Sequence, residues 1–404
     1  MSAQLTNQFF WRHQPLKTIY LAYALASIAV RLPFWFVLAL VPSLRPRASW
    51  TVGRTVLVHA ARVLFGAIFN TGSFELVRVD PQRFAKNPDA VGLVWMDATP
   101  DLIQGDVKKY AQLNKVSAVH VPAYWYGERD PITKRVGQRA QPDEKVILAF
   151  HSGGWVMGDA SPGGASAPMM RDMLSHYPQF SRLLNVEFRL ASGAPWRSEN
   201  PFPAALIDAI AAYSYLVNDL GFRAANVLVI GESAGGTLGL QLVRYTAEAG
   251  LAQLPPPGGL LMLSPSMDWG KTFPSGPGSS WVRNADSDWV QAFTAGYASK
   301  ALLGELPGSE AQVNSWISPA STQLEGFEGM FKGLPPTLTL AGGGEMTNDA
   351  MRLAHERIKA DVGEEKATFI EIPDATHIFL NLPFHEREKE DAYQKMAPWI
   401  KAHF

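Results

Sequence analysis

The 404-residue chain is 47% hydrophobic and 18% charged, and its 36 Lys and Arg residues nearly balance its 37 Asp and Glu residues. This is the composition of a globular protein, and a net charge of −1 gives no electrostatic argument for nucleic acid as a partner. The absence of cysteine excludes disulfides, thiolate nucleophiles and cysteine-bound metals. No Asn-x-Ser/Thr sequon is present, which favours an intracellular location.

The first 50 residues form an apolar segment of about membrane-spanning length, which begins near Lys17. Arg31 and Pro33 interrupt it, so the pattern predicts two apolar helices, at about residues 18–30 and 34–44. Two interpretations stay open. The helices are either a cap packed on the rest of the protein, or a membrane-associated segment that acts as an anchor or an interfacial hairpin.

The remaining residues, 51–404, are predicted to form one α/β catalytic domain. Helical spacing marks residues 51–70, and β-like runs lie near residue 74, at 91–96 and at 116–126. Short apolar runs then alternate with amphipathic segments, which predicts a mostly parallel central sheet flanked by helices. These runs are 146–150, 183–188, 227–231, 260–264, 337–342 and 368–372. A Gly-, Pro-, Ser- and Trp-rich stretch at 267–318 departs from this rhythm and is interpreted as a cap excursion.

The motif Gly-Glu-Ser-Ala-Gly at 231–235 lies between a predicted buried strand and a predicted helix. The pattern G-x-S-x-G in this context places Ser233 on a tight turn, with its hydroxyl exposed at the carboxyl end of the sheet. The N–H of Ala234 and the helix dipole would face developing negative charge there. By chance the pentapeptide is common, so the flanking strand and helix carry the argument that Ser233 is a nucleophile.

A glycine-rich loop, His-Ser-Gly-Gly-Trp, follows the strand at 146–150. Gly153 and Gly154 lack a Cβ atom, so their N–H groups can approach a substrate oxygen and form an oxyanion hole. The alternative is a flexible or phosphate-binding loop, but the loop has neither the G-x-G-x-x-G pattern nor the lysine of such sites.

The loop HSGGWVMGD followed by GESAGG resembles the hormone-sensitive-lipase-like (family IV) branch of the α/β-hydrolases. The segment FRLASGAPWRSENPFPAALIDAIAAYSYL between the two motifs is similar to that family as well, as are LSPSMDWG and GLPPTLTLAGGGEMTNDAM. The resemblance extends from about residue 146 to the carboxyl terminus. Ser152 departs from the family's H-G-G-G loop. An apolar amino terminus is also found in fungal steryl-acetyl-hydrolase-like members.

The resemblance implies an α/β-hydrolase fold with a catalytic triad in the order serine, acid, histidine. His377 lies just after a predicted strand, where the family places its histidine, whereas His355 and His385 lie in charged helical runs and are expected to be solvated. Glu345 occupies the first acidic position of the acid loop. Asp349 occupies the second, and Asp374, which lies close to His377, is a third candidate.

The predicted activity is hydrolysis of small or moderately lipophilic esters through a Ser233–His377–Glu345 triad and an acyl-enzyme, without a metal or organic cofactor. A serine acyltransferase or amidase on the same triad is the first alternative. A non-catalytic small-molecule receptor is the second, although that function would favour a broken triad. The partners expected are a small ester and a membrane surface, and the sequence leaves the oligomeric state open.

Overall fold

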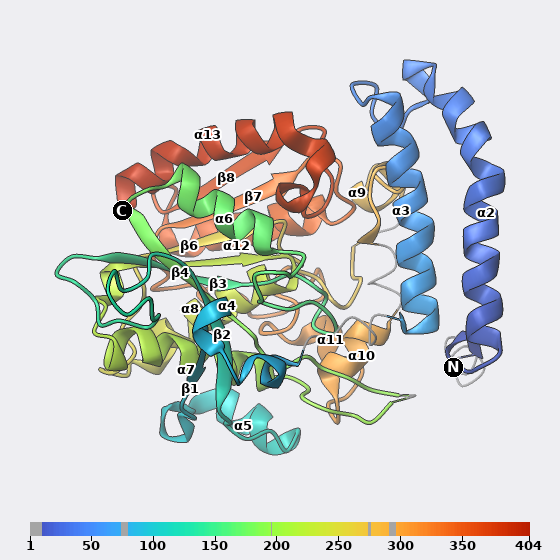
Figure 1. Ribbon diagram of the computed structural model, residues 1–404. Coiled ribbons are helices and arrows are strands. Elements are labelled where there is room, and N and C mark those ends of the chain that lie inside the picture. The colour runs from blue at the N-terminus through green and yellow to red at the C-terminus, as the bar shows by residue number, and fades with distance from the viewer. Residues whose placement is uncertain (1–9, 74–79, 195, 274–275, 291–295) are drawn as a thin grey trace.

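The computed structural model describes residues 10–73, 80–194, 196–273, 276–290 and 296–404 (Figure 1). Its centre is one eight-stranded sheet in the order β1-β2-β4-β3-β5-β6-β7-β8. The pairs β1–β2 and β2–β4 are antiparallel and the other five are parallel, which confirms the predicted mostly parallel sheet. The strands are β1 (Leu93–Met96), β2 (Val121–Gly127), β3 (Lys145–Phe150), β4 (Phe180–Val186), β5 (Val227–Glu232), β6 (Gly259–Leu263), β7 (Thr337–Gly342) and β8 (Ala367–Ile372).

The strand predicted near residue 74 falls largely on 74–79, outside the described residues. The helices are α2 (Leu16–Ala39), α3 (Val52–Thr71), α4 (Pro88–Val91), α5 (Gly105–Leu113), α6 (Ala167–His176), α7 (Ala204–Ser214), α8 (Ala234–Ala249), α9 (Ser280–Arg283), α10 (Tyr297–Leu303), α11 (Glu310–Val313), α12 (Asn348–Val362) and α13 (Glu386–His403). The excursion predicted at 267–318 carries the short helices α9, α10 and α11.

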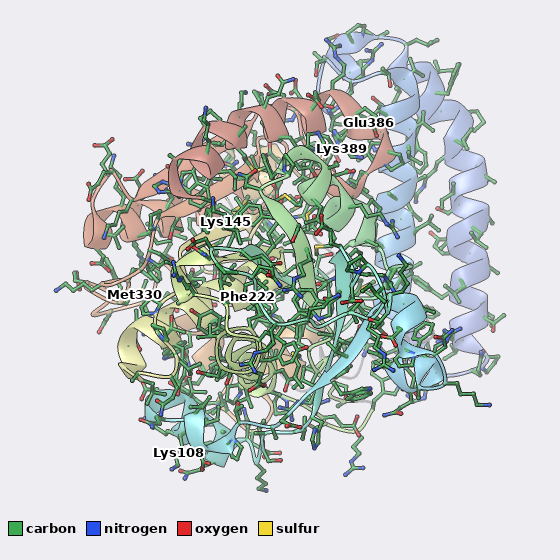
Figure 2. The ribbon with its side chains drawn as sticks, turned by 60° about the vertical axis from the view of Figure 1, so that its left-hand side comes forward. Lys108, Lys145, Phe222, Met330, Glu386 and Lys389 are labelled. Atoms are coloured by element: carbon green, nitrogen blue, oxygen red, sulfur yellow. The ribbon has the colours of Figure 1, made fainter. Side chains whose placement is uncertain are left out.

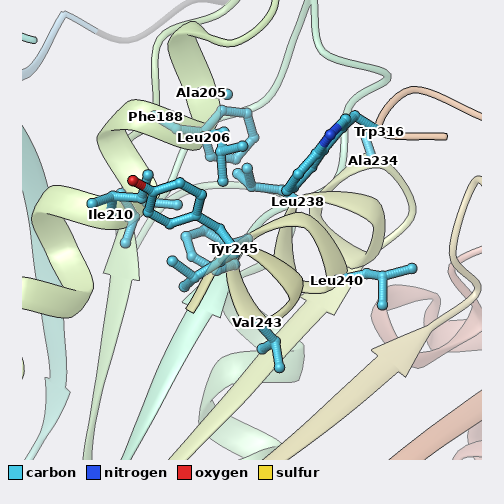
Figure 3. Packing of buried hydrophobic residues seen from close by; sticks show 14 of the residues in the cluster. Phe188, Ala205, Leu206, Ile210, Ala234, Leu238, Leu240, Val243, Tyr245 and Trp316 are labelled. Atoms are coloured by element: carbon cyan, nitrogen blue, oxygen red, sulfur yellow. The ribbon is translucent and has the colours of Figure 1, made fainter. Parts of the chain in front are cut away.

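Helices cover both faces of the sheet, and successive residues of the central strands face opposite cores. Leu148 of β3 packs in the core under α5, α7, α8 and α12, whereas its neighbour Ile147 packs in the core under α6 and α13. Figure 3 shows part of the first core, where Leu238 of α8 lies beside Trp316. Because both faces are buried, the central strands are continuous apolar runs, which is why the sequence reveals them.

The amino-terminal segment forms a helical hairpin at one end of the molecule (Figure 1). The prediction of two helices within residues 18–44 is wrong, because α2 continues through Pro33 as one helix of 24 residues. Proline removes one backbone donor, but the carbonyl of Ala29 that loses its partner lies on an exposed residue, so the helix is not forced to break there. The second helix of the hairpin is α3, which matches the prediction for 51–70.

Both hairpin helices are long and apolar enough to cross a membrane by length and composition alone. α3 lies between α2 and the sheet domain, and α2 is the outermost element (Figure 1). The boundary proposed near residue 50 falls in the connection between the two helices.

Candidate active site

Ser233 lies on the sharp turn between β5 and α8. Its backbone has φ 56° and ψ −117°, a conformation that L-residues rarely adopt outside such strained turns. The flanking glycines allow close packing at this turn. A Cβ atom on Gly231 would lie 2.0 Å from the Gly235 carbonyl oxygen, and one on Gly235 would lie 2.3 Å from the Phe150 carbonyl oxygen. The motif is therefore explained by backbone geometry, which places the serine hydroxyl at the carboxyl edge of the sheet.

A chain of hydrogen bonds joins the three residues predicted from the sequence. His377 Nε2 lies 2.9 Å from Ser233 Oγ, and His377 Nδ1 lies 2.7 Å from Glu345 Oε2. A carboxylate only accepts hydrogen bonds, so the neutral imidazole carries its proton on Nδ1 and leaves Nε2 to accept from the serine hydroxyl. All three side chains are buried, and Glu345 is fully buried. The arrangement can move the serine proton to the imidazole.

The other oxygen of Glu345 is held by two further donors. Ser264 Oγ donates to Oε1 at 2.7 Å, and the N–H of Gly342, the last residue of β7, donates to it at 2.6 Å. The carboxylate therefore sits back over the end of its own strand, which is how the longer glutamate side chain meets the imidazole. These donors also satisfy a charge that burial would otherwise penalise.

The other candidate acids and histidines lie elsewhere. Asp349 accepts a 2.8 Å hydrogen bond from the Ser280 N–H at the start of α12, and Asp374 accepts one of 2.6 Å from Ser49 in a turn. His355 is half-buried on α12. The expectation that His385 is solvated is wrong. It is fully buried, 3.0 Å from Thr376 Oγ1, because α3 and Trp50 cover the loop that contains it.

The electrostatic surroundings favour a charged imidazole at His377. Burial by itself lowers the pKa of His377, but the hydrogen bond and charge of Glu345, with the nearby Asp288 and Glu232, leave it raised above 6.5. Burial raises the pKa of Glu232 to about 7 and that of Asp288 to about 6. The imidazolium that forms when Ser233 loses its proton therefore lies among acidic groups.

The glycine-rich loop starts at the end of β3, next to β5 in the sheet, so it begins at the same edge as Ser233. Gly153 has φ 129° and Gly154 has φ 61°, both positive. In the described part of the chain, neither glycine donates its N–H to another protein group. Burial lowers the pKa of the adjacent His151 to about 4, so this ring is neutral at pH 7 and its Nδ1–H donates to the Ser152 carbonyl oxygen at 2.7 Å.

Several residues near this chain were missed by the sequence reasoning. Ser264 supports Glu345, Ser266 Oγ lies 3.2 Å from Ser233 Oγ, and Asn381 donates to both oxygens of Glu232 at 2.7 and 2.8 Å. A signal existed for the two serines, since both follow directly after the predicted strand at 260–264. For Asn381 the sequence holds no pattern that could have revealed the contact.

The amino-terminal segment also contacts the loops that carry the acid and the histidine. Arg47 donates to the carbonyl oxygen of Gly343 at 2.5 Å, two residues before Glu345. Trp50 is fully buried, and its indole N–H donates to the Asp374 carbonyl oxygen at 2.8 Å, three residues before His377. Residues far apart in sequence are thus joined next to the candidate site.

A cavity of about 240 Å³ lies beside the acid loop. Met346 and Thr347, which follow Glu345 directly, contribute to its wall, and Trp281 of the excursion lines it too. The other tryptophans of the excursion, Trp269, Trp289 and Trp316, are buried in the cores. The remaining lining residues are Asp268, Lys271, Phe273, Ser280, Asp349 and Ala350. Within the described residues, no cluster of side chains has the composition of a metal site.

Residues 147–381, more than half of the chain, match the family described as alpha/beta hydrolase fold. The chain belongs to this family. As an α/β-hydrolase it is 28% identical over 198 residues to "Esterase LipI" of Mycobacterium tuberculosis, which covers 46% of this chain and 57% of that protein. It is 27% identical over 248 residues to an "Acetyl-hydrolase" of Streptomyces hygroscopicus, covering 59% of this chain and 70% of that protein.

Among solved structures, this α/β-hydrolase is similar to a hormone-sensitive lipase from a metagenome library. The identity is 26%, the TM-score is 0.53, and the match covers 70% of this chain and 83% of the other. The matched part of the chain spans little more than half the length of the M. tuberculosis esterase. The resemblance to hormone-sensitive-lipase-like esterases is confirmed by these likenesses, and the fungal type stays a prediction.

Proposed function

We propose that the protein is a serine carboxylic ester hydrolase that acts on small to moderately lipophilic esters. The observation that carries this proposal is the hydrogen-bonded chain from Ser233 Oγ through His377 to Glu345, on a serine held in the strained turn of a nucleophile. The similarity to an esterase and an acetyl-hydrolase supports ester hydrolysis and favours short acyl groups.

In the proposed mechanism, Ser233 Oγ forms a bond to the ester carbonyl carbon while its proton passes to His377 Nε2. Glu345 keeps the imidazole in the correct tautomer and stabilises the imidazolium. The tetrahedral intermediate then expels the alcohol, which takes the proton from Nε2 and leaves an acyl-enzyme. Water repeats the sequence: it attacks the acyl carbon, gives its proton to His377, and releases the carboxylic acid and free Ser233.

The oxyanion of each tetrahedral intermediate is assigned to the N–H groups of Gly153, Gly154 and Ala234. Ala234 is the first residue of α8, where backbone N–H groups have no partner within the helix and the helix dipole favours negative charge. The two loop glycines donate to no other group in the described part of the chain, which leaves their N–H groups available. In comparable sites, loss of one such donor costs about a hundredfold or more in rate.

A hydrolysis screen of aryl esters from acetyl to long acyl tests this proposal, with Ser233→Ala alongside the wild type. We expect the wild type to prefer short acyl groups and Ser233→Ala to lose about 10⁵-fold or more in kcat. Ser266→Ala is the matched control, because it removes a hydroxyl 3.2 Å from Ser233 Oγ and leaves the Ser233–His377–Glu345 chain in place. Full activity of Ser233→Ala would disprove the nucleophile, and inactivity of the wild type on every ester would favour the receptor function.

We also propose an intracellular enzyme whose amino-terminal segment contacts a membrane. The support is the apolar exposed surface of α2 and the length and composition of α2 and α3. The alternative is that the hairpin serves only as a cap on the domain.

A further inference from the structure

α2 leaves one whole side uncovered, and that side is apolar. Within this helix of 24 residues only Ala24 and Ala39 are buried. Figure 2 shows α2 as the outermost element of the hairpin, with side chains extending away from the body. The large hydrophobic residues that are exposed on it are Ile19, Tyr23, Leu25, Val30, Leu32, Phe34, Phe36 and Val37. At 100° per residue these positions, with Ala22, Ala29 and Pro33, occupy one continuous side of the helix, and no charged residue lies among them.

The charge of the same region has one sign. Residues 1–73 contain no Asp or Glu and seven Lys or Arg, although the whole chain has a net charge of −1. Lys17 lies in the first turn of α2, Arg31 lies on the edge of the apolar side, and Arg45 follows the helix. The hairpin is therefore positive and the rest of the chain is acidic, a distribution that would turn the hairpin toward an anionic surface and the body away from it.

α3 is fastened to the body along its length. Arg54 pairs with Glu388 and donates to the Phe384 carbonyl oxygen at 2.9 Å, and Arg62 pairs with Asp286 at 2.7 Å. Further along, Phe65 stacks on Trp289 with ring centroids 5.8 Å apart.

α2 in turn is fastened to α3. Trp35 stacks on His59 at 5.4 Å, and Asn70 donates to Tyr20 at 2.9 Å. If the hairpin crossed a bilayer, these contacts would draw the acidic partners of α3 on the body into hydrocarbon, where an ionised side chain is costly.

We infer that α2 lies in the plane of an anionic bilayer surface, with its apolar side inserted at the boundary between headgroups and acyl chains, and does not span the membrane. This inference rests on the membrane contact proposed above and specifies its geometry and its lipid chemistry. A second copy of the chain fits the same side less well, because two positive hairpins would repel each other.

The chain has no cysteine, so single cysteines can be introduced on α2 and spin-labelled without a background. Ile19, Val30 and Val37 are 56%, 78% and 60% exposed and lie on the same side of the helix. On vesicles of phosphatidylcholine and phosphatidylserine, we expect similar shallow depths for Ile19→Cys, Val30→Cys and Val37→Cys. A spanning helix would instead place the label at 30 deep in the bilayer, and those at 19 and 37 toward opposite surfaces. Ile132→Cys, 88% exposed on the body, is the control and should stay in water.

Vesicle sedimentation supplies the second measurement. We expect binding to rise with the phosphatidylserine fraction, to fall with salt, and to drop at least tenfold for Val30→Asp with Val37→Asp, whereas Ile132→Asp binds as the wild type does. Each variant should keep its hydrolysis of a soluble aryl ester, and Ser233→Ala should still bind, so a failure of the esterase proposal is separable.

The outcomes that overturn the inference are distinct. No binding of the wild type to any vesicle would refute membrane contact itself. A depth gradient along α2 would keep the contact and refute the in-plane geometry. A dimer in vesicle-free solution that dissociates with Val30→Asp would assign the apolar side to a second copy of the chain.

Discussion

Glu345 accepts hydrogen bonds from His377, Ser264 and the Gly342 N–H, and the whole side chain is buried. Asp349, four residues later, binds a backbone N–H at the start of α12 instead. We predict that Glu345→Gln lowers kcat/KM by about 10³- to 10⁴-fold, because an amide no longer stabilises the imidazolium. Asp349→Asn is the matched control and should stay near wild type. Steady-state kinetics on an aryl acetate decide, and the reverse ranking would transfer the role to Asp349.

The raised pKa of His377 predicts the acidic limb of the pH profile. The imidazole must be neutral to accept the serine proton, so activity is present above its pKa and lost as the pH falls through it. We expect the midpoint of that limb in kcat/KM to lie above pH 6.5.

Glu232→Gln tests the cause of this shift. It removes one of the carboxylates that raise the pKa of His377, so the midpoint should move to lower pH. Asp143→Asn, on an exposed pair with Arg223, is the control and should leave the profile unchanged. An unmoved midpoint in Glu232→Gln would contradict the electrostatic account.

At the scale of elements, the connection from α2 to α3 holds the two loops of the candidate site. Asn284, which is fully buried, donates to the carbonyl oxygens of Gly343 and Glu345 and accepts from Arg47 at 2.5 Å. The guanidinium thus braces the acid loop both directly and through Asn284.

We predict that Arg47→Met lowers kcat about tenfold or more with a smaller change in KM, because a small displacement of the acid loop misplaces the imidazole. Arg31→Met, an exposed arginine of the same hairpin, is the matched control. Equal kinetics for the two variants would show that the brace does not position the site. Partial rescue by Arg47→Lys would support the hydrogen bond as the cause.

The elements differ in how well the sequence predicts them. Central strands such as β5 and β7 are buried on both faces, so they appear as uninterrupted apolar runs. The break expected at Pro33 was wrong because an exposed helix tolerates a missing backbone bond. The contact of Arg47 with Gly343 spans 296 residues of sequence, and no local pattern reports a pairing of that kind.

The same distinction holds within the candidate site. Ser233 is recognisable because a strained turn requires small neighbours, which leaves a motif in the sequence. The choice between Glu345 and Asp349 needed coordinates, since both acids lie in the same loop and only the packing decides which one reaches the imidazole.

At the scale of the molecule, the two hairpin helices have different roles in this account. Removing residues 1–40 deletes α2 but keeps Arg47, Trp50 and α3, so we predict loss of vesicle binding and retained hydrolysis of a soluble ester. Removing residues 1–73 also deletes the cover over the histidine loop, and we predict loss of both. Assays in low detergent, which shields the α3 surface, compare the two truncations. Equal inactivity of both would show that α2 is an essential cap.

The central claim is covalent catalysis by Ser233, and mass spectrometry of the protein quenched during hydrolysis of an aryl acetate tests it most directly. The account predicts an acetyl group on the peptide that contains Ser233, formed in a burst and absent from Ser233→Ala. An acetyl group on a different side chain, or unchanged turnover by Ser233→Ala, would contradict it.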